Sequence, residues 1–344
     1  MQKVGLNIEK DHRSIGARLM VYDIVFITDN KYVVPTVVAI TSLIANKEKS
    51  HFYNVHIITT NLTFYNRHLL KRLNTETVDI DIIDKSDLVC QYAHIDQNRH
   101  VTPSALLKFF LPDIFPNLNK ILYLDSDIIL QKGFEDIFNT ELGNSYAAVV
   151  KDILCKLNRK HMIKFNINND FYFNTGVLLL NLKKMREENI AQKLIDYRIN
   201  NKNYFMDQDT FNAVIGSNVK YISYKYNFLN YYLEKLSPKE LSIFYDEYMP
   251  KYPILIYKNC SIVHLGGVYK PWIYKMGYLS RLYKRYWKKS LLKNKKFKLI
   301  YLPDKEPYIR HIFSIRNDDR QSHKVITILG LKFKFKRRRS NAKG

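Results

Sequence analysis

Apolar segments of strand length alternate with segments of helix length in the first part of this chain, and this alternation limits the folds that it can adopt. A strand is predicted at residues 22–28 (YDIVFIT) and a helix over residues 35–46. Further strands are expected at residues 54–60 and 78–83, with a helix over residues 63–73 between them. Strands joined by helix-length connections form βαβ units, whose strands run parallel. The chain is therefore predicted to be an α/β protein with a mostly parallel sheet.

The same kinds of segment continue along the chain. Helices are predicted over residues 103–110 and 206–215, and strands over residues 146–150 and 176–181. Hydrophobic residues make up 46% of the 344 residues, which is ordinary for a chain that buries a core. With 11 glycines and 3 cysteines, the composition excludes a collagen-like chain and a scaffold held by disulfides.

Residues 120–130 (KILYLDSDIIL) place two carboxylates inside an otherwise apolar segment. Asp125 and Asp127 follow a predicted buried strand, where both side chains can reach one hard divalent cation. Burying two like charges so close together is costly unless a cation compensates them. A solvated turn is the alternative, but the apolar residues on both sides favour a metal site.

A glycine-rich segment, residues 264–272 (HLGGVYKPW), follows a short apolar run at residues 261–263. Its two adjacent glycines permit close approach of a ligand to the backbone, and Lys270 can bind phosphate as a point charge. His264 as a metal ligand beside such a lysine would suit a complex of a metal with a diphosphate. The alternative is a structural loop that ends at the Pro-Trp pair.

Further polar residues stand at the predicted ends of strands and helices. Asn174 lies in FNTGVLLLNL, and Asp207 and Gln208 lie in MDQDTFNAVIG. Asn and Asp are common helix caps and turn formers, so a structural role is the first interpretation of these residues. Asp29 and Tyr32 follow the first strand, and open α/β sheets bind ligands at the carboxyl ends of their strands. Their position favours a binding role.

Positive charge is concentrated at the C-terminal end of the chain. The net charge is +23, and residues 273–344 contribute +18 of it, with 22 basic and 4 acidic residues. The remainder is close to neutral, which argues against a protein that binds nucleic acid along its whole surface. We expect three parts: an N-terminal extension (1–21), a main domain (22–272) and a basic, aromatic C-terminal region (273–344).

The three cysteines, Cys90, Cys155 and Cys260, form no CxxC or Cys/His spacing, so neither a disulfide framework nor a zinc site is expected. The first twenty residues lack the apolar run of a signal peptide. No apolar window reaches the length of a membrane span. The expected location is the cytoplasm.

Five motifs occur in a fixed order along the chain: VFITDNKY, LYLDSD, FNTGVLLLNL, DQD and HLGGVYKPW. Together they resemble glycosyltransferase family 8, and most of all its bacterial lipopolysaccharide and lipooligosaccharide glucosyl- and galactosyltransferases. The likeness extends over residues 22–272. It implies a GT-A fold, in which helices flank a Rossmann-like, mostly parallel sheet. It also implies an enzyme that moves glucose or galactose from a UDP-sugar with retention of configuration.

The resemblance assigns roles to individual residues. Asp125, Asp127 and His264 match the ligands of a Mn²⁺ or Mg²⁺ ion, and Tyr32 matches a residue that stacks on uracil. The residues expected near the reacting sugar, as catalytic groups, are Gln208, Asp207 and Asp152. The full set expected to bind the nucleotide and the donor sugar is Ile27, Thr28, Asp29, Lys31, Tyr32, Lys108, Asp125, Ser126, Asp127, Asn174, Thr175, Asp207, Gln208, His264, Gly267 and Lys270.

One position departs from the family pattern. Relatives often carry arginine seventeen residues before the first aspartate of the DxD pair, where this chain has Lys108. Lysine keeps the positive charge but lacks the two-pronged geometry with which arginine binds phosphate or carboxylate. The sequence alone does not predict which groups Lys108 contacts.

A lipid-linked glycan, such as the core of lipopolysaccharide or lipooligosaccharide, is the acceptor that the resemblance implies. Cations interleaved with aromatic residues in residues 273–344 suit an anionic membrane surface, so we expect a peripheral location on the inner face of the cytoplasmic membrane. A solvated extension and a nucleic-acid-binding segment are the alternatives for this region. For the whole chain, the alternatives are a basic nucleic-acid-binding protein and a catalytically silent module that binds glycan or sugar nucleotide.

Overall fold

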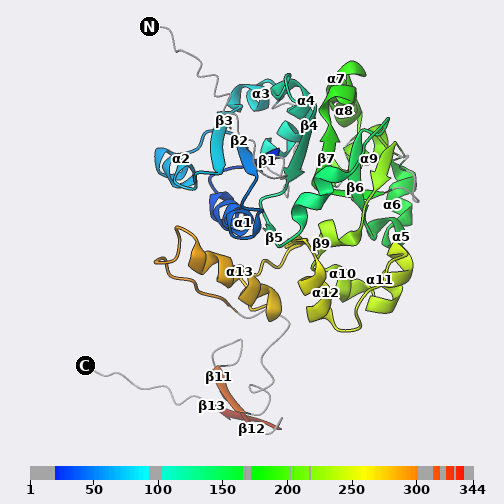
Figure 1. Cartoon of the computed structure of the whole chain (residues 1–344). Helices are drawn as coiled ribbons and strands as arrows, with labels where there is room; N and C mark the ends of the chain where they lie inside the picture. Colours follow the sequence, from blue (N-terminus) through cyan, green and yellow to red (C-terminus); the bar gives the residue numbers. More distant parts are fainter. Residues whose placement is uncertain are drawn as a thin grey trace.

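The computed structural model describes most of residues 20–300 in full and the backbone of three short strands beyond them (Figure 1). The described residues are 20–92, 103–165, 167, 172–201, 203, 205–216, 218–300, 313–317, 323–328 and 331–336. The expected N-terminal extension lies almost wholly outside these residues, as does much of the C-terminal region after residue 300.

The first half of the main sheet is parallel, as the βαβ pattern predicted. The elements of this half are β1 (Val21–Thr28), α1 (Val33–Asn46), β2 (Phe52–Thr59), α2 (Phe64–Lys71), β3 (Val78–Asp84) and β4 (Lys120–Leu124). β1 pairs in parallel with both β2 and β4, and β2 pairs in parallel with β3. Ile24, Val25 and Phe26 are fully buried in succession, because both faces of β1 are covered. This double coverage explains the uninterrupted apolar run at residues 22–28.

The second half of the sheet contains both strand directions. It is made of β6 (Ala147–Lys151), β7 (Phe173–Asn181) and β8 (Val219–Tyr221). β7 runs antiparallel to β4 on one side and to β6 on the other, whereas β6 and β8 are parallel. The order across the seven strands is β3-β2-β1-β4-β7-β6-β8. The expected α/β architecture, a mixed and mostly parallel sheet flanked by helices, is therefore confirmed.

Directly after β4, the chain continues into a second, three-stranded sheet. Its strands are β5 (Ile128–Leu130), β9 (Phe228–Leu229) and β10 (Ile262–His264). β10 lies between the other two, antiparallel to β5 and parallel to β9. The segment KILYLDSDIIL is therefore two buried strands in different sheets, joined by the short acidic turn. His264 is the last residue of β10 and pairs in register with Ile128.

Helices cover the sheets and fill the connections. The remaining elements, with η marking 3₁₀-helices, are α3 (Ser86–Gln91), η1 (Pro103–Phe110), α4 (Leu111–Ile114), η2 (Phe134–Asn139), α5 (Leu154–Leu157), α6 (Arg159–Lys164), α7 (Leu182–Glu187), α8 (Ile190–Asn200), α9 (Met206–Val214), η4 (Tyr224–Tyr226), α10 (Tyr232–Lys235), α11 (Pro238–Tyr245), α12 (Pro253–Asn259) and α13 (Tyr278–Lys289). The backbone strands after residue 300 are β11 (Phe313–Asn317), β12 (His323–Ile328) and β13 (Leu331–Lys336), which form an antiparallel sheet. Within the described parts of the chain, no helix is both long enough and apolar enough to cross a lipid bilayer.

The helix predicted over residues 103–110 differs in type from a regular α-helix. The structure has the 3₁₀-helix η1 there, followed directly by the single turn α4. Pro112 lacks the N–H that a continuous α-helix would bond to the carbonyl of Lys108, so the helix is divided at this point. The division keeps Lys108 near the C-terminal end of η1.

α13 extends the hydrophobic core beyond residue 272. Its buried face, formed by Leu279, Leu282, Tyr283, Tyr286 and Trp287, belongs to the same hydrophobic cluster as α1. The two helices lie side by side in Figure 1, and the side-chain amide of α1's last residue donates to the hydroxyl of Tyr286 at 2.8 Å. The domain boundary expected after residue 272 stays a prediction drawn from composition, whereas the core itself continues into α13.

Leu282→Ala tests how far α13 contributes to the fold. Leu282 is 1% exposed, so its truncation should leave a cavity and lower the free energy of unfolding by about 2–5 kcal/mol. Lys288→Ala is the matched control, because Lys288 is exposed on the same helix and should change stability by less than about 0.5 kcal/mol. Chemical denaturation of both variants measures the difference. Equal stability of the two variants would mean that α13 is only loosely attached.

Candidate active site between the two sheets

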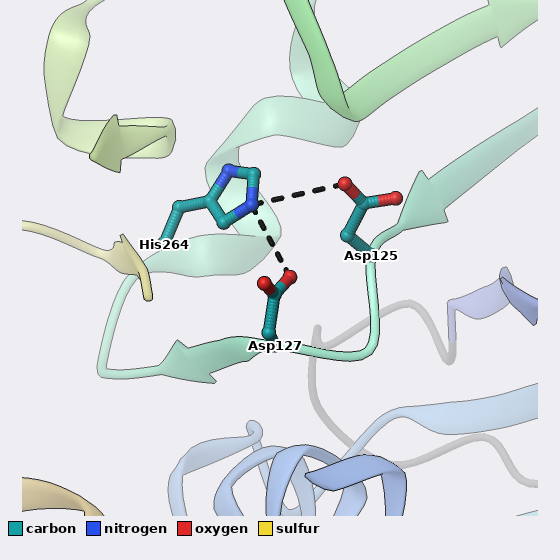
Figure 2. Close-up of side chains that lie close together, drawn as sticks. All are labelled: Asp125, Asp127 and His264. Carbon is teal, nitrogen blue, oxygen red and sulfur yellow. Dashed lines mark ion pairs between the residues drawn. The ribbon is translucent and has the colours of Figure 1, made fainter. Parts of the chain in front are cut away.

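Two aspartates and a histidine meet where the chain passes from the main sheet to the second sheet. Asp125 follows β4, Asp127 precedes β5 and His264 ends β10. Figure 2 shows both carboxylates facing the imidazole: Nε2 of His264 lies 3.7 Å from Oδ2 of Asp125 and 3.2 Å from Oδ1 of Asp127. One ligand atom from each residue lies within 4.8 Å of the others. Two carboxylate oxygens and an imidazole nitrogen at this spacing fit a divalent cation such as Mn²⁺ or Mg²⁺.

Hydrogen bonds to β7, to β1 and to the residue that follows β10 fix the turn that carries the carboxylates. The N–H of Asp125 donates to the carbonyl of Gly176 in β7 at 2.8 Å, and the N–H of Leu265 donates to the carbonyl of Asp127 at 2.7 Å. The hydroxyl of Ser126 donates to a carbonyl of β1 at 2.9 Å. The expected site residue Ser126 therefore anchors the turn, while its two neighbours face the imidazole.

Two lysines, the buried Lys108 and the half-buried Lys270, form ion pairs with the carboxylates of this site. Nζ of Lys270 lies 2.5 Å from Oδ2 of Asp127, and Nζ of Lys108 lies 2.5 Å from Oδ2 of Asp207 and 3.5 Å from Oδ1 of Asp125. Burial alone would raise the pKa of Asp127, but Lys270 and the imidazole hold it well below its ordinary value. Burial alone would lower the pKa of Lys108, but its two aspartates raise it above the ordinary value. Lys108, which departs from the family pattern, therefore bridges two acidic site residues as a cation.

A cavity of about 230 Å³ opens beside the acidic turn. Most of its walls come from residues that the motifs assigned to the nucleotide, whereas Ser104, Ala105 and Tyr123 were not singled out by the sequence. The lining residues are Ile27, Thr28, Asp29, Tyr32, Ser104, Ala105, Lys108, Tyr123, Asp125, Ser126, Asp127 and Asp207. The structure thus brings together the end of β1, η1 and the acidic turn around one space.

Asp29 shapes the entry into α1. Its Oδ1 accepts from the backbone N–H groups of Lys31 at 2.8 Å and Tyr32 at 2.9 Å. The side chain of Lys31 is exposed, and this residue lines neither of the two cavities described in this section. Its expected contact with the nucleotide stays a prediction.

The contact of Tyr123 with the site could have been predicted from its spacing to Asp125 in the sequence. Its hydroxyl donates to Oδ1 of Asp125 at 2.6 Å, and Nζ of Lys108 lies 4.5 Å from the centre of its ring. Residues two apart along a strand share one face, so Tyr123 and Asp125 in LYLD were placed together by the strand period. Ser104 and Ala105 gave no such signal, because only the fold brings η1 to this edge of the sheet.

A larger cavity of about 600 Å³ shares Asp125 and Asp127 with the first. The expected site residues along its walls are Asp125, Asp127, Asn174, Gln208, His264, Gly267 and Lys270. Phe205 and Tyr231, which lie outside the motifs, and Tyr269, which lies in HLGGVYKPW without an assigned role, add aromatic walls. Gly267 has a φ of 84°, in the left-handed region that glycine adopts without strain.

A buried hydrogen-bond network joins three of the expected site residues. Oδ2 of Asp152 accepts from Nδ2 of Asn174 at 3.2 Å and from Nε2 of Gln208 at 3.1 Å. Nδ2 of Asn174 also donates to Oε1 of Gln208 at 2.9 Å. Burial raises the pKa of Asp152 even though its hydrogen-bond donors lower it. Asp207 has different partners, since it accepts from the hydroxyl of Thr175 at 3.1 Å and pairs with the lysine of η1.

Gly176 leaves space for two of the three candidate metal ligands. A Cβ at this position would lie 2.2 Å from Cε1 and 2.7 Å from Nδ1 of His264, and 2.8 Å from Oδ2 of Asp125. Cβ contacts this short essentially never occur in proteins, so a larger residue has to displace one of the two ligands.

Gly176→Ala should weaken divalent-cation binding about 10-fold or more, because the ligands can no longer converge. Isothermal titration of Mn²⁺ measures the change. Val177→Ala is the control: this neighbour in β7 is fully buried, so its truncation should reduce stability while cation affinity stays near that of the unmodified chain. Equal affinity of Gly176→Ala and the unmodified chain would mean that the cation binds elsewhere.

Comparisons with known proteins agree with this geometry. A sequence model described as glycosyl transferase family 8 matches residues 23–276. A lipopolysaccharide 1,2-glucosyltransferase of Escherichia coli is 26% identical over 255 residues, which cover 71% of each chain. A Haemophilus influenzae relative is 27% identical over 212 residues, and the match covers 60% of this chain and 63% of that protein.

Solved structures share the fold. A galactosyltransferase, LgtC, crystallised with donor and acceptor sugar analogues, superposes with a TM-score of 0.66 at 22% identity, over 78% of this chain and 96% of that one. The glycosyltransferase GlyE of Streptococcus pneumoniae gives a TM-score of 0.56 at 24% identity, over 78% of this chain and 60% of that one. The family match covers most of the chain, including the acidic turn and β10. This chain is a glycosyltransferase and belongs to glycosyl transferase family 8.

Proposed function

We propose that this glycosyltransferase moves a hexose, glucose or galactose, from a UDP-sugar to a lipid-linked glycan acceptor, with retention of configuration and with a bound Mn²⁺ or Mg²⁺. The observation that carries the proposal is the convergence of Asp125, Asp127 and His264 beside two cavities that share the carboxylates. A sugar nucleotide has its diphosphate between the nucleoside and the sugar. The smaller cavity then takes the nucleoside, and the larger one takes the sugar and the acceptor.

The uridine is proposed to bind at the end of β1. Tyr32 lines the smaller cavity and offers its ring to the base, while Ile27, Thr28 and Asp29 form the adjoining wall. An ordinary tyrosine is already uncharged at neutral pH, and burial raises the pKa of Tyr32 further. Aromatic rings stack on any nucleobase, so preference for uracil has to come from polar contacts of the wall.

Positive charge around the acidic turn is proposed to stabilise the leaving diphosphate. When bound, the cation would supply Lewis-acid stabilisation of the phosphate oxygens. Lys270 and Lys108 place two further positive charges on either side of the carboxylate pair. Charges that are fixed in advance lower the barrier most when negative charge grows on the phosphate as the bond to the sugar breaks.

Gln208, Asp207 and Asp152 are proposed to act around the donor sugar. Gln208 lines the larger cavity, and the fully buried Asp152 holds its side-chain amide. Asp207 forms an ion pair with Lys108, and both residues line the smaller cavity. Without an assigned covalent nucleophile, we infer a short-lived oxocarbenium-like ion that the acceptor attacks from the leaving-group side, which preserves the configuration.

The names of the relatives support a lipid-linked glycan as acceptor. The Escherichia coli relative is a lipopolysaccharide 1,2-glucosyltransferase and LgtC is a galactosyltransferase, so the donor sugar stays open between glucose and galactose. Two other functions predict different results. A catalytically silent module would bind a UDP-sugar without releasing UDP, and a nucleic-acid-binding protein would not need the Asp–Asp–His set.

Asp125→Asn should lower metal-dependent UDP release about 10²–10³-fold, because one charged contact to the cation is lost. The assay offers UDP-glucose and UDP-galactose with Mn²⁺ or Mg²⁺, with and without a lipooligosaccharide acceptor, and chelation by EDTA should abolish release. Asp79→Asn, an exposed aspartate of β3, is the matched control and should leave turnover unchanged. Release that persists in Asp125→Asn, or in EDTA, would remove the metal from the proposal.

We also propose that the exposed face of α13 rests on an anionic membrane, which would hold the enzyme at the inner face of the cytoplasmic membrane. Residues 273–300 contain ten Lys and Arg and no Asp or Glu. The opposite face of α13 is buried in the core, so the exposed cations of the helix point away from it. They are Arg281, Lys284, Arg285, Lys288 and Lys289. Each cation near an anionic surface contributes about 1 kcal/mol.

Changing these five residues of α13 to glutamine should release the chain from vesicles that contain phosphatidylglycerol. Co-sedimentation measures binding, and phosphatidylcholine vesicles show how much of it is nonspecific. Because only the exposed face is altered, thermal unfolding should change little. A second variant that ends at residue 300 separates the later residues from α13. If only that variant loses binding, α13 is not the membrane contact.

A further inference from the structure

A buried amide, Asn227, connects the candidate metal ligand His264 to the network behind the sugar cavity. Asn227 lies between η4 and β9 and is fully buried. Its Oδ1 lies 2.9 Å from Nδ1 of His264, and its Nδ2 donates to Oδ1 of Asn174 at 2.8 Å. Both polar atoms of its side chain therefore contact expected site residues, although no motif drew attention to this position.

The direction of these hydrogen bonds follows from one backbone group. The N–H of Gly176 donates to Oδ1 of Asn174 at 2.9 Å, and a backbone N–H can only donate. The other end of the Asn174 amide must therefore be its donor, which agrees with its bond to the carboxylate of Asp152.

The same reasoning extends to the imidazole. Because Oδ1 of Asn174 accepts, Asn227 must present its NH₂ group to Asn174 and its oxygen to His264. An amide oxygen can only accept, so Nδ1 of His264 carries a proton and donates it. The N–H of Gly176 in β7 thus fixes the orientation of Asn174, which fixes that of Asn227, which in turn fixes that of His264.

We propose that Asn227 is a positioning residue that holds the proton of His264 on Nδ1 and turns Nε2 toward Asp125 and Asp127 as a metal ligand. This inference rests on the cation proposed above for the function of the site. Metal-binding histidines generally donate their other ring N–H to a neighbouring acceptor, and loss of that acceptor typically weakens metal binding about 10–100-fold.

Asn227 also links cation binding to the donor sugar. Asn174, which accepts from Asn227, donates to Oε1 of Gln208 at 2.9 Å. A rotation of the imidazole that breaks its bond to Asn227 therefore disturbs the amide that orients Gln208. The metal ligand and the residue expected beside the reacting sugar are held by one continuous set of hydrogen bonds.

The test compares three variants of the full chain by titration with Mn²⁺. Asn227→Leu removes the acceptor and should weaken Mn²⁺ binding about 10–100-fold. Asn227→Asp keeps an oxygen opposite Nδ1 and should restore most of that affinity, while kcat stays low because the donor to Asn174 is lost. Asn212→Leu is the matched control: this buried amide of α9 bonds backbone groups and should reduce stability without changing Mn²⁺ affinity.

Two results of this comparison would overturn the inference. One is an Asn227→Leu variant that is folded and binds Mn²⁺ as tightly as the unmodified chain. The other is an Asn212→Leu variant whose affinity falls as far as that of Asn227→Leu, because a general loosening of the core would then explain both losses.

A measurement on the metal-free chain separates this inference from the proposed function. Long-range ¹⁵N correlation spectra of histidine-labelled protein, with His264→Gln to assign the signal, show which ring nitrogen is protonated. A proton on Nδ1 of His264 supports the role of Asn227, and its absence overturns it. If the unmodified chain binds neither Mn²⁺ nor Mg²⁺, the proposed metal fails, and the spectrum still decides the orientation of His264.

Discussion

Repulsion between the carboxylates of Asp125 and Asp127 is the constraint on which this structure depends. Two like charges on a short buried turn are unfavourable unless positive charge and hydrogen bonds surround them. The chain meets this requirement with Lys108 on one side and Lys270 on the other. These groups come from distant parts of the sequence. The acidic turn therefore takes its stabilising contacts from η1, the second sheet and the glycine-rich segment together.

The second sheet supplies part of the surroundings that these two carboxylates need. A chain that continued from β4 into another strand of the main sheet would leave the carboxylates without partners from β10. By passing into β5 instead, it sets the acidic turn against β10, with hydrogen bonds to β1 and β7. The two cavities meet at this crossing, where both are lined by Asp125 and Asp127.

Local patterns in the sequence predicted most strands of the main sheet and singled out Asp125 and Asp127, because strand periodicity and the cost of buried charge are visible within ten residues. The parallel first half of the sheet follows from such patterns, whereas the division of residues 120–130 between two sheets does not. The contacts of Lys108 could not be predicted, since its closest partner, Asp207, is 99 residues away. Asn227 was missed for a similar reason: it lies outside the motifs, and only the fold brings it to His264. The composition of residues 273–300 indicated a basic region, but it concealed the apolar face of α13, because cations and aromatic residues alternate there at helical spacing.

The place of α13 in the core has a consequence for the biosynthesis of the protein. α1 ends at Asn46, yet part of its apolar surface packs against a helix that begins only at Tyr278. While the ribosome is still adding the roughly two hundred residues between these two helices, that surface lacks the helix that packs against it in the folded protein. The nascent polypeptide can assemble its parallel strands early, but the contact between α1 and α13 can form only after α13 has left the exit tunnel.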